Sequence, residues 1–93
     1  MAWVKVDGKD QGDVILYALS TCGWCKKTRA LLEELGVAYQ YRYVDLESGA
    51  ERESTLDEVR KWNPQTSFPT IVINGKECIM GFQPDKIKGA LGL

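Results

Sequence analysis

The sequence predicts an α/β fold in which helices pack on both faces of a mixed four-stranded sheet, with an extra β-strand at the N-terminus. An apolar run is followed by a helical pattern and then by an alternating strand, the order of a parallel strand–helix–strand unit. A second helical pattern precedes two short strands joined by Asn-Gly, a typical hairpin turn. A length of 93 residues suits one domain, so we expect 1–93 to be a single domain whose residues 1–12 form an N-terminal strand and turn.

Two strands are predicted before the first helix. Residues 2–6 (AWVKV) alternate apolar and polar side chains, as in a strand with one exposed face. Residues 7–13 are rich in Gly and Asp, which predicts a turn. Residues 14–19 (VILYAL) are continuously apolar, which predicts a strand that is covered on both faces.

The first helix is predicted from Trp24 to Leu35, because apolar side chains recur there at helical spacing. One face of this helix carries Trp24, Thr28, Leu31, Leu32 and Leu35. Gly36 is placed to end the helix. Residues 38–46 (AYQYRYVDL) alternate and predict the next strand, with Tyr39, Tyr41 and Tyr43 packed under a helix.

The second helix is predicted to begin at Ser48 and Glu51, which have the spacing of a capping box. It runs to Trp62, because Asn63-Pro64 disfavours a further turn. Its inward side chains are expected to be Leu56, Val59 and Trp62.

The clearest hairpin of the chain follows in residues 69–80. Residues 69–73 (PTIVI) and 76–80 (KECIM) read as strands, and Asn74-Gly75 between them suits a type I′ turn. Pro84 stands where a first helical residue would, and a short helix is expected from there to about Leu91.

Composition and charge exclude several classes of function. The formal net charge of −1 gives no electrostatic basis for binding nucleic acid or an anionic membrane. No apolar run approaches the roughly 18 residues of a membrane span, and residues 1–10 lack the apolar core of a secretory signal. We therefore expect a cytoplasmic protein. The chain has no histidine, which excludes Cys–His hydrolases and zinc sites that use histidine.

The candidate reactive site is the Cys22-Gly23-Trp24-Cys25 motif, at the junction between the apolar strand and the first helix. Side chains three apart on a helix are near neighbours, so the pair can switch between dithiol and disulfide without unfolding the chain. A purely structural disulfide here would close a tiny loop and stabilise little. A metal or a shared iron–sulfur cluster is an alternative that needs further ligands, such as Cys78 or a carboxylate. We expect no metal.

The two cysteines are not expected to be equivalent. Cys22 stands at the helix start, where unpaired backbone N–H groups and the helix dipole favour an anion. Cys25 lies one turn further, nearer the core and less acidic. This asymmetry predicts that Cys22 attacks a substrate disulfide and that Cys25 then attacks Cys22, leaving an internal disulfide for a reductase to reset. Gly23 would let a partner chain approach closely.

A second signal is Phe68-Pro69, directly before the hairpin. From the residues alone, the Phe68–Pro69 bond is trans as in most X–Pro bonds, or it is cis and turns the backbone toward the cysteine pair. In the second case the polar backbone groups of Phe68 are free to pair with an extended substrate segment.

With these motifs, residues 13–92 resemble the thioredoxin fold, a three-layer arrangement, and the glutaredoxin family in particular. The resemblance rests on Cys22-Gly23-Trp24-Cys25, Ser67-Phe68-Pro69-Thr70 and the stretch 81–87 (GFQPDKI). It implies a dithiol–disulfide oxidoreductase with Cys22 as nucleophile and Cys25 as resolving cysteine. It also implies a cis Pro69 and substrate contacts through Phe68.

The same resemblance bears on the partners. Glutathione-using glutaredoxins usually have Pro-Tyr between the cysteines and a glycine pair where this chain has Gly81-Phe82. The stretch 81–87 is more similar to NrdH-type redoxins, which accept electrons from a thioredoxin-reductase-like flavoprotein. We expect a monomer that acts on protein disulfides, with Gly81, Phe82 and Trp24 in the substrate site. The alternatives are glutathione as a co-substrate, and an iron–sulfur or metal carrier that uses the same cysteines.

Other notable side chains have structural interpretations. Cys78 is expected to be a small buried hydrophobe, with a regulatory or cluster-ligating thiol as the alternative. Trp24 is expected to be either an exposed contact beside Cys22 or a packing residue. The structural interpretation also covers Trp3, Trp62 and Tyr17 as core or covering residues, and Lys26, Lys27 and Arg29 as a solvated face or one that steers partners.

Overall fold

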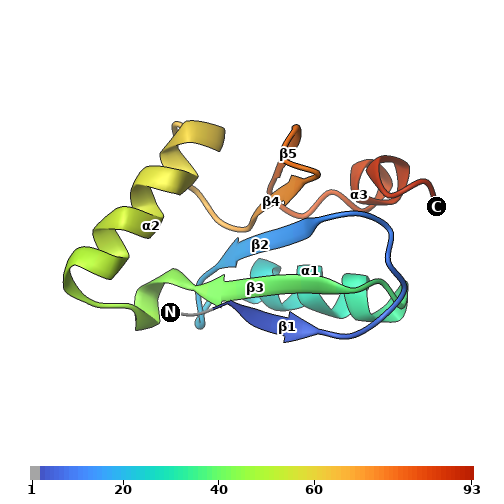
Figure 1. The fold of residues 1–93 in the computed structure, drawn as a ribbon, viewed down its shortest axis with the longest axis horizontal. Coiled ribbons are helices and arrows are strands. Elements are labelled where there is room, and N and C mark those ends of the chain that lie inside the picture. Colours follow the sequence, from blue (N-terminus) through green and yellow to red (C-terminus); the bar gives the residue numbers. More distant parts are fainter. Residues whose placement is uncertain (1–2) are drawn as a thin grey trace.

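The computed structural model describes residues 3–93 and places the predicted strands in one five-stranded sheet (Figure 1). The elements in chain order are β1 (Val4–Val6), β2 (Val14–Ala18), α1 (Gly23–Glu34), β3 (Tyr39–Tyr43), η1 (Val44–Leu46), α2 (Gly49–Trp62), β4 (Thr70–Ile73), β5 (Glu77–Met80) and α3 (Pro84–Ala90). The α/β prediction is confirmed, including the extra N-terminal strand.

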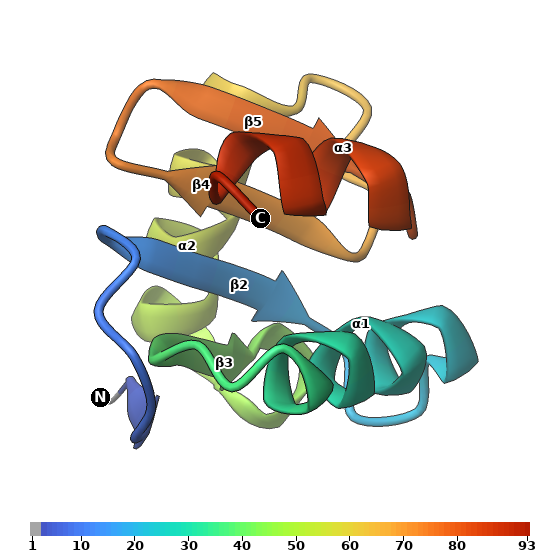
Figure 2. The same cartoon turned by 90° about the vertical axis from the view of Figure 1, so that its right-hand side faces the viewer.

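The sheet has the strand order β1-β3-β2-β4-β5, with the fully apolar β2 at its centre (Figure 2). β2 pairs in parallel with β3, with Leu16 opposite Tyr41, and antiparallel with β4, with Leu16 opposite Ile71. β4 and β5 form the predicted hairpin, in which Asn74 and Gly75 both have positive φ, as a type I′ turn requires.

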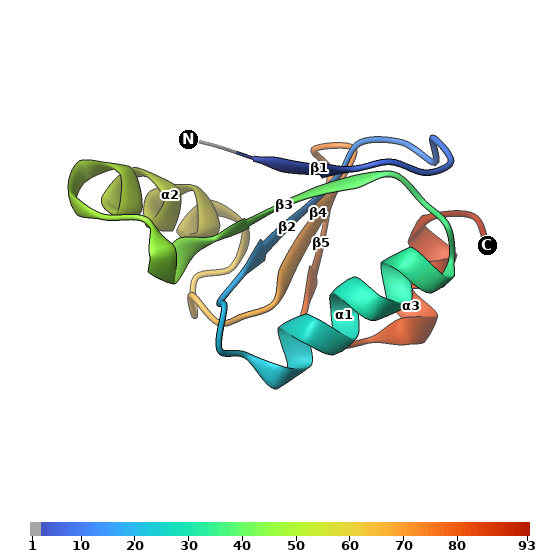
Figure 3. The ribbon, with the colours of Figure 1, turned by 90° about the horizontal axis from the view of Figure 1, so that it is seen from below.

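Alternate side chains of β2 enter two separate cores. Leu16 and Ala18 belong to the larger core, with side chains of α1 and α3. Tyr17 belongs to the smaller core, which includes Val59 of α2. Helices therefore cover both faces, as predicted: α1 and α3 lie together on one face, and α2 packs against the other (Figure 3).

The N-terminal segment is attached to the edge of the sheet. β1 pairs antiparallel with β3, and Lys9 exchanges backbone hydrogen bonds with Gly36 and Ala38. A Cβ atom at Gly8 would lie 2.6 Å from the backbone carbon of Val37, so only glycine allows this close approach. The strand predicted over 2–6 starts at Ala2, which lies outside the described residues.

Three local predictions were wrong. The strand predicted over 38–46 ends at Tyr43, because Val44–Leu46 forms a 3₁₀ turn. Ser48 is the N-cap of α2, but its side chain makes no capping hydrogen bond, so the serine half of the predicted capping box does not form. Cys78 is half-buried rather than buried, since it lies on β5 at the edge of the sheet.

Other predicted contacts are confirmed. Pro84 occupies the first turn of α3, and Gly36 takes positive φ just after α1. Tyr17 is buried, and its hydroxyl donates a hydrogen bond to Glu58 at 2.9 Å. Trp3 covers this residue, with the two rings 5.3 Å apart.

Candidate active site at the N-terminus of α1

The loop after β2 leads into α1 and brings Cys22 to the start of the helix. Cys22 is the N-cap residue: its backbone is extended, and its Sγ atom accepts a hydrogen bond from the backbone N–H of Cys25 at 3.1 Å. This N–H is one of the groups at a helix N-terminus that have no partner within the helix. The sulfur of Cys22 is half-buried and faces the positive end of the helix dipole, where the sequence predicted it.

Cys25 lies on the buried side of the same turn. Its exposed fraction is 1%, and it packs with the core of α1 and α3. Burial raises the pKa of the Cys25 thiol to about 12, and the hydrogen bond with Cys22 and the negative charge of Asp45 act in the same direction. A backbone hydrogen bond with Leu19 opposes them. Cys25 is therefore a neutral thiol at physiological pH, and its predicted burial is confirmed.

An open groove lies beside the first turn of α1. Its walls are Trp24, Phe68, Pro69, Gly81 and Phe82. Trp24 is 57% exposed, as in the first of its two predicted interpretations, an exposed residue beside Cys22, and it stacks on Phe82 with the ring centroids 5.7 Å apart. The groove is therefore lined mainly by apolar side chains, and none of its five lining residues has an ionisable side chain. Gly23 beside it is open, because a Cβ atom there would have no neighbour within 4 Å.

The far wall of the groove is held by backbone contacts. The Phe68–Pro69 peptide bond is cis, as the resemblance implied. The N–H of Gly81 donates to the carbonyl of Pro69 at 2.9 Å, and Gly81 has a φ of +83°, which favours glycine. Five of the six predicted substrate-site residues therefore line one groove, and the sixth, Gly23, lies with Cys22 and Cys25 at the start of α1, next to Trp24 in the chain.

Asn63 anchors the loop that carries Phe68 and Pro69. It is fully buried, and its side-chain amide donates to the Ser67 hydroxyl at 2.9 Å and to the Thr70 hydroxyl at 3.1 Å. Sequence reasoning assigned Asn63 only to the end of a helix. A single buried amide contributes to no periodic sequence pattern, so these hydrogen-bond partners could not be predicted from the sequence.

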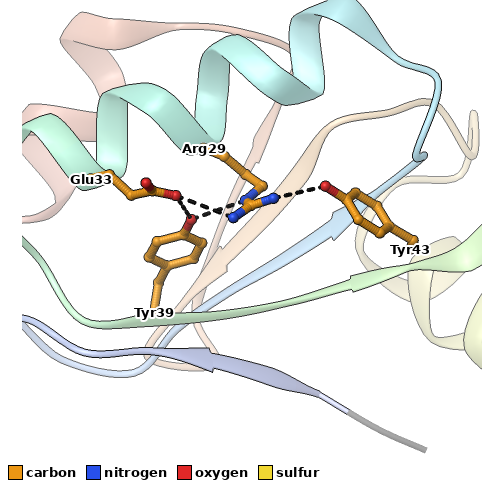
Figure 4. Close-up of polar contacts among 4 residues, drawn as sticks. All are labelled: Arg29, Glu33, Tyr39 and Tyr43. Carbon is orange, nitrogen blue, oxygen red and sulfur yellow. Dashed lines mark hydrogen bonds and ion pairs between the residues drawn. The ribbon is translucent and has the colours of Figure 1, made fainter.

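Arg29 fastens α1 to β3, one turn after Cys25 (Figure 4). Its guanidinium donates to the hydroxyls of Tyr39 at 3.1 Å and Tyr43 at 2.8 Å, and it pairs with Glu33 at 3.2 Å. It also lies 4.0 Å above the ring of Tyr41. The predicted packing of the three tyrosines under a helix is confirmed, but the prediction of Arg29 as a solvated residue was wrong. Lys26 and Lys27 are exposed, as predicted.

Asp45 holds the loop that precedes Cys22. Its carboxylate accepts hydrogen bonds from the backbone N–H of Ser20, at 2.8 Å, and from the Ser20 hydroxyl. The sequence prediction placed Asp45 in a strand and missed this contact. Ser20 and Asp45 lie close together because β2 and β3 are parallel neighbours that end at the same edge of the sheet. Without that pairing, the sequence gives no reason to expect the contact.

The residues that the structure describes contain no group of three or more Cys, Asp or Glu side chains arranged to hold a metal ion. The third cysteine, Cys78, lies on the edge strand β5, and burial raises the pKa of its thiol.

None of the helices in the described part of the chain is long and apolar enough to cross a membrane.

The chain also matches a known protein family. The family model described as Glutaredoxin matches residues 14–78. Among curated proteins, Glutaredoxin-C6 of Oryza sativa subsp. japonica is 38% identical over 64 residues, which are 68% of this chain and 54% of that protein. The Gene 56 protein of Mycobacterium phage D29 is 34% identical over 74 residues, 80% of this chain and 77% of that protein. The chain spans about half the length of the plant relatives it matches first.

Solved structures extend the likeness over the whole chain. The glutaredoxin from Methanosarcina mazei Go1 is 48% identical, with a TM-score of 0.92, and the match covers 100% of this chain and 90% of that chain. The methanoredoxin of Methanosarcina acetivorans is 42% identical, with a TM-score of 0.92, and the match covers 100% of this chain and 97% of that chain. The thioredoxin-like fold is therefore shown, including the N-terminal strand.

Proposed function

This chain belongs to the glutaredoxin family, and from that premise we propose that it is a dithiol–disulfide oxidoreductase that reduces protein disulfides through Cys22 and Cys25. The observation that carries the proposal is the pairing of unlike thiols on one helical turn. Cys22 is half-buried at the helix N-terminus, whereas Cys25 is 1% exposed beneath it.

The first half of the reaction takes place at Cys22. Its thiolate attacks one sulfur of the substrate disulfide, forms a mixed disulfide and expels the other substrate sulfur as a thiolate, which takes up a proton. The positive end of the α1 dipole lies at the attacking sulfur. Gly23 leaves room for the substrate backbone, since no atom lies within 4 Å of the position of a Cβ.

The second half of the reaction takes place at Cys25. Cys25 loses its proton and attacks the Sγ of Cys22, which forms the Cys22–Cys25 disulfide and releases the second substrate thiol. Both electrons that reduce the substrate come from the two cysteines. The low acidity of Cys25 delays this step until the mixed disulfide is in place, so the order of attack is Cys22 first.

The groove favours a protein segment as substrate over glutathione. Glutathione carries two carboxylates and one ammonium group, whereas the five residues that line the groove carry no charge. The rim of the groove supplies the ammonium of Lys27, 4.6 Å from the centre of the Trp24 ring, but no carboxylate lines the groove to meet the ammonium group of glutathione. An extended segment with an apolar side chain beside its cysteine would instead cover Trp24 and Phe82. The backbone of Phe68 would pair with such a segment.

The electron donor follows from the same preference. A thioredoxin-reductase-like flavoprotein presents a reduced dithiol to the groove, which reduces the Cys22–Cys25 disulfide and becomes a disulfide itself, so it is the donor we favour, with glutathione and its reductase as the alternative. We place the protein in the cytoplasm, where reducing partners keep dithiols reduced. We propose that it acts there as a monomer.

The test is a turnover assay with two donor systems. Wild-type protein is supplied with a disulfide substrate such as insulin, and with either a thioredoxin reductase or glutathione and its reductase. Turnover with the flavoprotein that is lost in Cys22→Ser supports the proposal, and turnover with glutathione alone reassigns the donor. An absorption band in freshly purified protein, lost when Cys22 is replaced, together with no reduction of insulin, would favour a cluster carrier.

A further inference from the structure

An irregular loop joins the end of α2 to the start of β4 and carries one wall of the groove (Figure 1). Phe68 and Pro69 are the residues of this loop that line the groove, and neither belongs to a helix or a strand. Thr66, two residues before Phe68, has a φ of +53°, which is uncommon for a residue other than glycine. Regular secondary structure therefore does not fix this wall, and its position depends on other contacts.

The side chain of Asn63 supplies such contacts from inside the loop. Asn63 is fully buried, and its Nδ2 donates to the Ser67 hydroxyl at 2.9 Å, to the Ser67 carbonyl at 3.2 Å and to the Thr70 hydroxyl at 3.1 Å. Its Oδ1 accepts from the backbone N–H of Gln65 at 3.1 Å. The buried Thr70 hydroxyl donates in turn to the Ser67 carbonyl at 2.8 Å. Both the nitrogen and the oxygen of one amide are thus bonded to a single loop.

The residues bonded to this amide flank the groove wall on both sides. Ser67 comes directly before Phe68, and Thr70 directly after Pro69. Thr70 is also the first residue of β4 and pairs with Tyr17 of the central strand β2, so the network joins the loop to the sheet. The two wall residues are therefore held between two points that bond to the same side chain.

The contacts continue from this wall to the opposite one. The carbonyl of Pro69 accepts from the N–H of Gly81 at 2.9 Å. Phe82, the next residue, stacks on Trp24. A shift of the loop would therefore change the groove on both sides.

We propose that Asn63 is a positioning residue for substrate recognition: its side-chain amide holds Phe68 and Pro69 where an extended substrate segment can pair with the Phe68 backbone and cover the groove. This inference rests on the proposed function, because it concerns the protein segment assigned there to the groove. Asn63 is buried and touches no substrate. Its loss should weaken recognition of the residues that flank the substrate cysteine and leave the attack by Cys22 unchanged.

Two disulfides with the same leaving group separate recognition from attack. The peptide reagent is an extended peptide with apolar residues around one cysteine, the small reagent is N-acetylcysteine amide, and in both the cysteine sulfur is joined to 2-nitro-5-thiobenzoate. The thiolate of Cys22 attacks the cysteine sulfur, forms a mixed disulfide with it and expels the coloured thiolate, which stopped-flow absorbance follows. Wild type should react about tenfold faster with the peptide reagent, because backbone pairing and apolar contact favour it.

Thr70→Val and Thr70→Ser are a matched pair of variants. Valine keeps the shape of threonine but deprives the Asn63 amide and the Ser67 carbonyl of one partner each, whereas serine keeps the hydroxyl and loses a methyl group. The ratio of the two rate constants, peptide over small reagent, should fall about threefold to tenfold in Thr70→Val, the factor that one hydrogen bond is worth. The ratio should stay near that of wild type in Thr70→Ser. Asn63→Ala should lower it at least as far as Thr70→Val does.

Thr55→Val is the control, because it makes the same change at a buried threonine of α2 outside the loop, and it should keep the wild-type ratio. The rate constant for the small reagent should be unchanged in every variant, which also shows that each is folded with a reactive Cys22. Should Asn63→Ala fail to fold, the two Thr70 variants decide the question alone.

The inference is overturned if Thr70→Val keeps the wild-type ratio, if Thr70→Ser lowers the ratio as far as Thr70→Val does, or if the variants slow both reagents alike. A wild type that reacts equally with the two reagents would refute a protein segment as the occupant of the groove, and the role of Asn63 with it. If wild type prefers the peptide reagent but fails to reduce insulin, the proposed function is removed, and the variants still decide whether Asn63 positions the wall.

Discussion

The two ends of α1 are built in contrasting ways. The first turn carries Cys22 and the exposed Trp24. Trp24 stacks on Phe82 of the groove wall, and Asp45 holds Ser20 in the loop that leads into this turn. The later turns carry Leu32, which is fully buried, and Arg29, which bonds two tyrosines of β3 and covers the ring of a third.

The contrast shows how a small domain can expose a reactive group without losing a fixed geometry. The later turns of α1 are joined to the sheet by apolar packing and by the Arg29 contacts, so the first turn need not be buried to stay in place. Its backbone N–H groups remain available to the sulfur of Cys22. Stability and reactivity are thus assigned to different turns of one helix, and substitutions at the two ends should have separable effects.

The largest expected effect is at the reactive end. Cys22→Ser should reduce disulfide turnover to the background rate, because the other thiol of that turn, Cys25, is 1% exposed and cannot meet a substrate disulfide. Cys25→Ser should still form the mixed disulfide but fail to release it, and the adduct should be visible by mass spectrometry as protein joined to substrate. Cys78→Ser is the matched control, and it should retain wild-type turnover. An adduct on Cys25 in the Cys22→Ser protein would reverse the assignment.

The next effect is at the anchored end. Arg29→Ala should lower the free energy of unfolding by about 2–3 kcal/mol, because it removes charged hydrogen bonds and leaves the hydroxyls of the buried Tyr39 and the half-buried Tyr43 with fewer partners. Urea denaturation measures this loss. Arg60→Ala is the control: Arg60 pairs with Asp57 on an exposed helix face, and the loss there should stay below about 1 kcal/mol. Equal losses in the two variants would refute the anchoring role.

A smaller effect is expected in the groove. Phe82→Ala removes the ring that stacks on Trp24, so the KM for a protein disulfide should rise about tenfold, while kcat changes little. Phe82→Leu retains apolar volume and should restore much of the affinity. The reaction with a small disulfide reagent should be unaffected in both variants. A fall in kcat with unchanged KM would instead place Phe82 in the chemical step.

The last effect is a change of stability that is confined to high pH. Burial, with the hydrogen bond to Glu33, raises the pKa of Tyr39 from 10.0 to about 12, although Arg29 opposes this shift. Between these values the unfolded phenol ionises while the folded one stays neutral, so stability falls as pH rises through this range. Tyr39→Phe lacks this loss, and the gap in unfolding free energy between wild type and variant should narrow from pH 10 to 12. A gap that stays constant would contradict the shift.

The fold could be predicted from the sequence because its strands and helices have strong local patterns. The continuous apolar run of 14–19 and the Asn74-Gly75 turn each depend on neighbouring residues alone. The boundary at Tyr43 could not be predicted in this way, because the chain turns there into a 3₁₀ helix whose Asp45 meets Ser20, 25 residues earlier in the sequence.

The candidate site was predictable in its reactive residues and not in its supports. Cys22 and Cys25 are identified by spacing and by their place before a helix, and Pro69 by its place before the hairpin. Asn63, Arg29 and Asp45 act through polar contacts between elements that are distant in sequence, and such contacts leave no periodic signal. Arg29 was mistaken for a solvated residue because its charge suggests exposure, whereas its guanidinium is shared by two phenols.

The central claim is that Cys22 and Cys25 differ in reactivity, and the most direct test of it is competitive alkylation of the reduced native protein. Iodoacetamide is added below saturation at neutral pH, and peptide mass spectrometry measures the modified fraction of each cysteine, with the same protein in denaturant as reference. We predict that Cys22 is modified long before Cys25 in the native protein and that the two react alike once the chain is unfolded. Equal modification of both thiols in the native state, or modification of Cys25 first, would contradict the proposed division of roles.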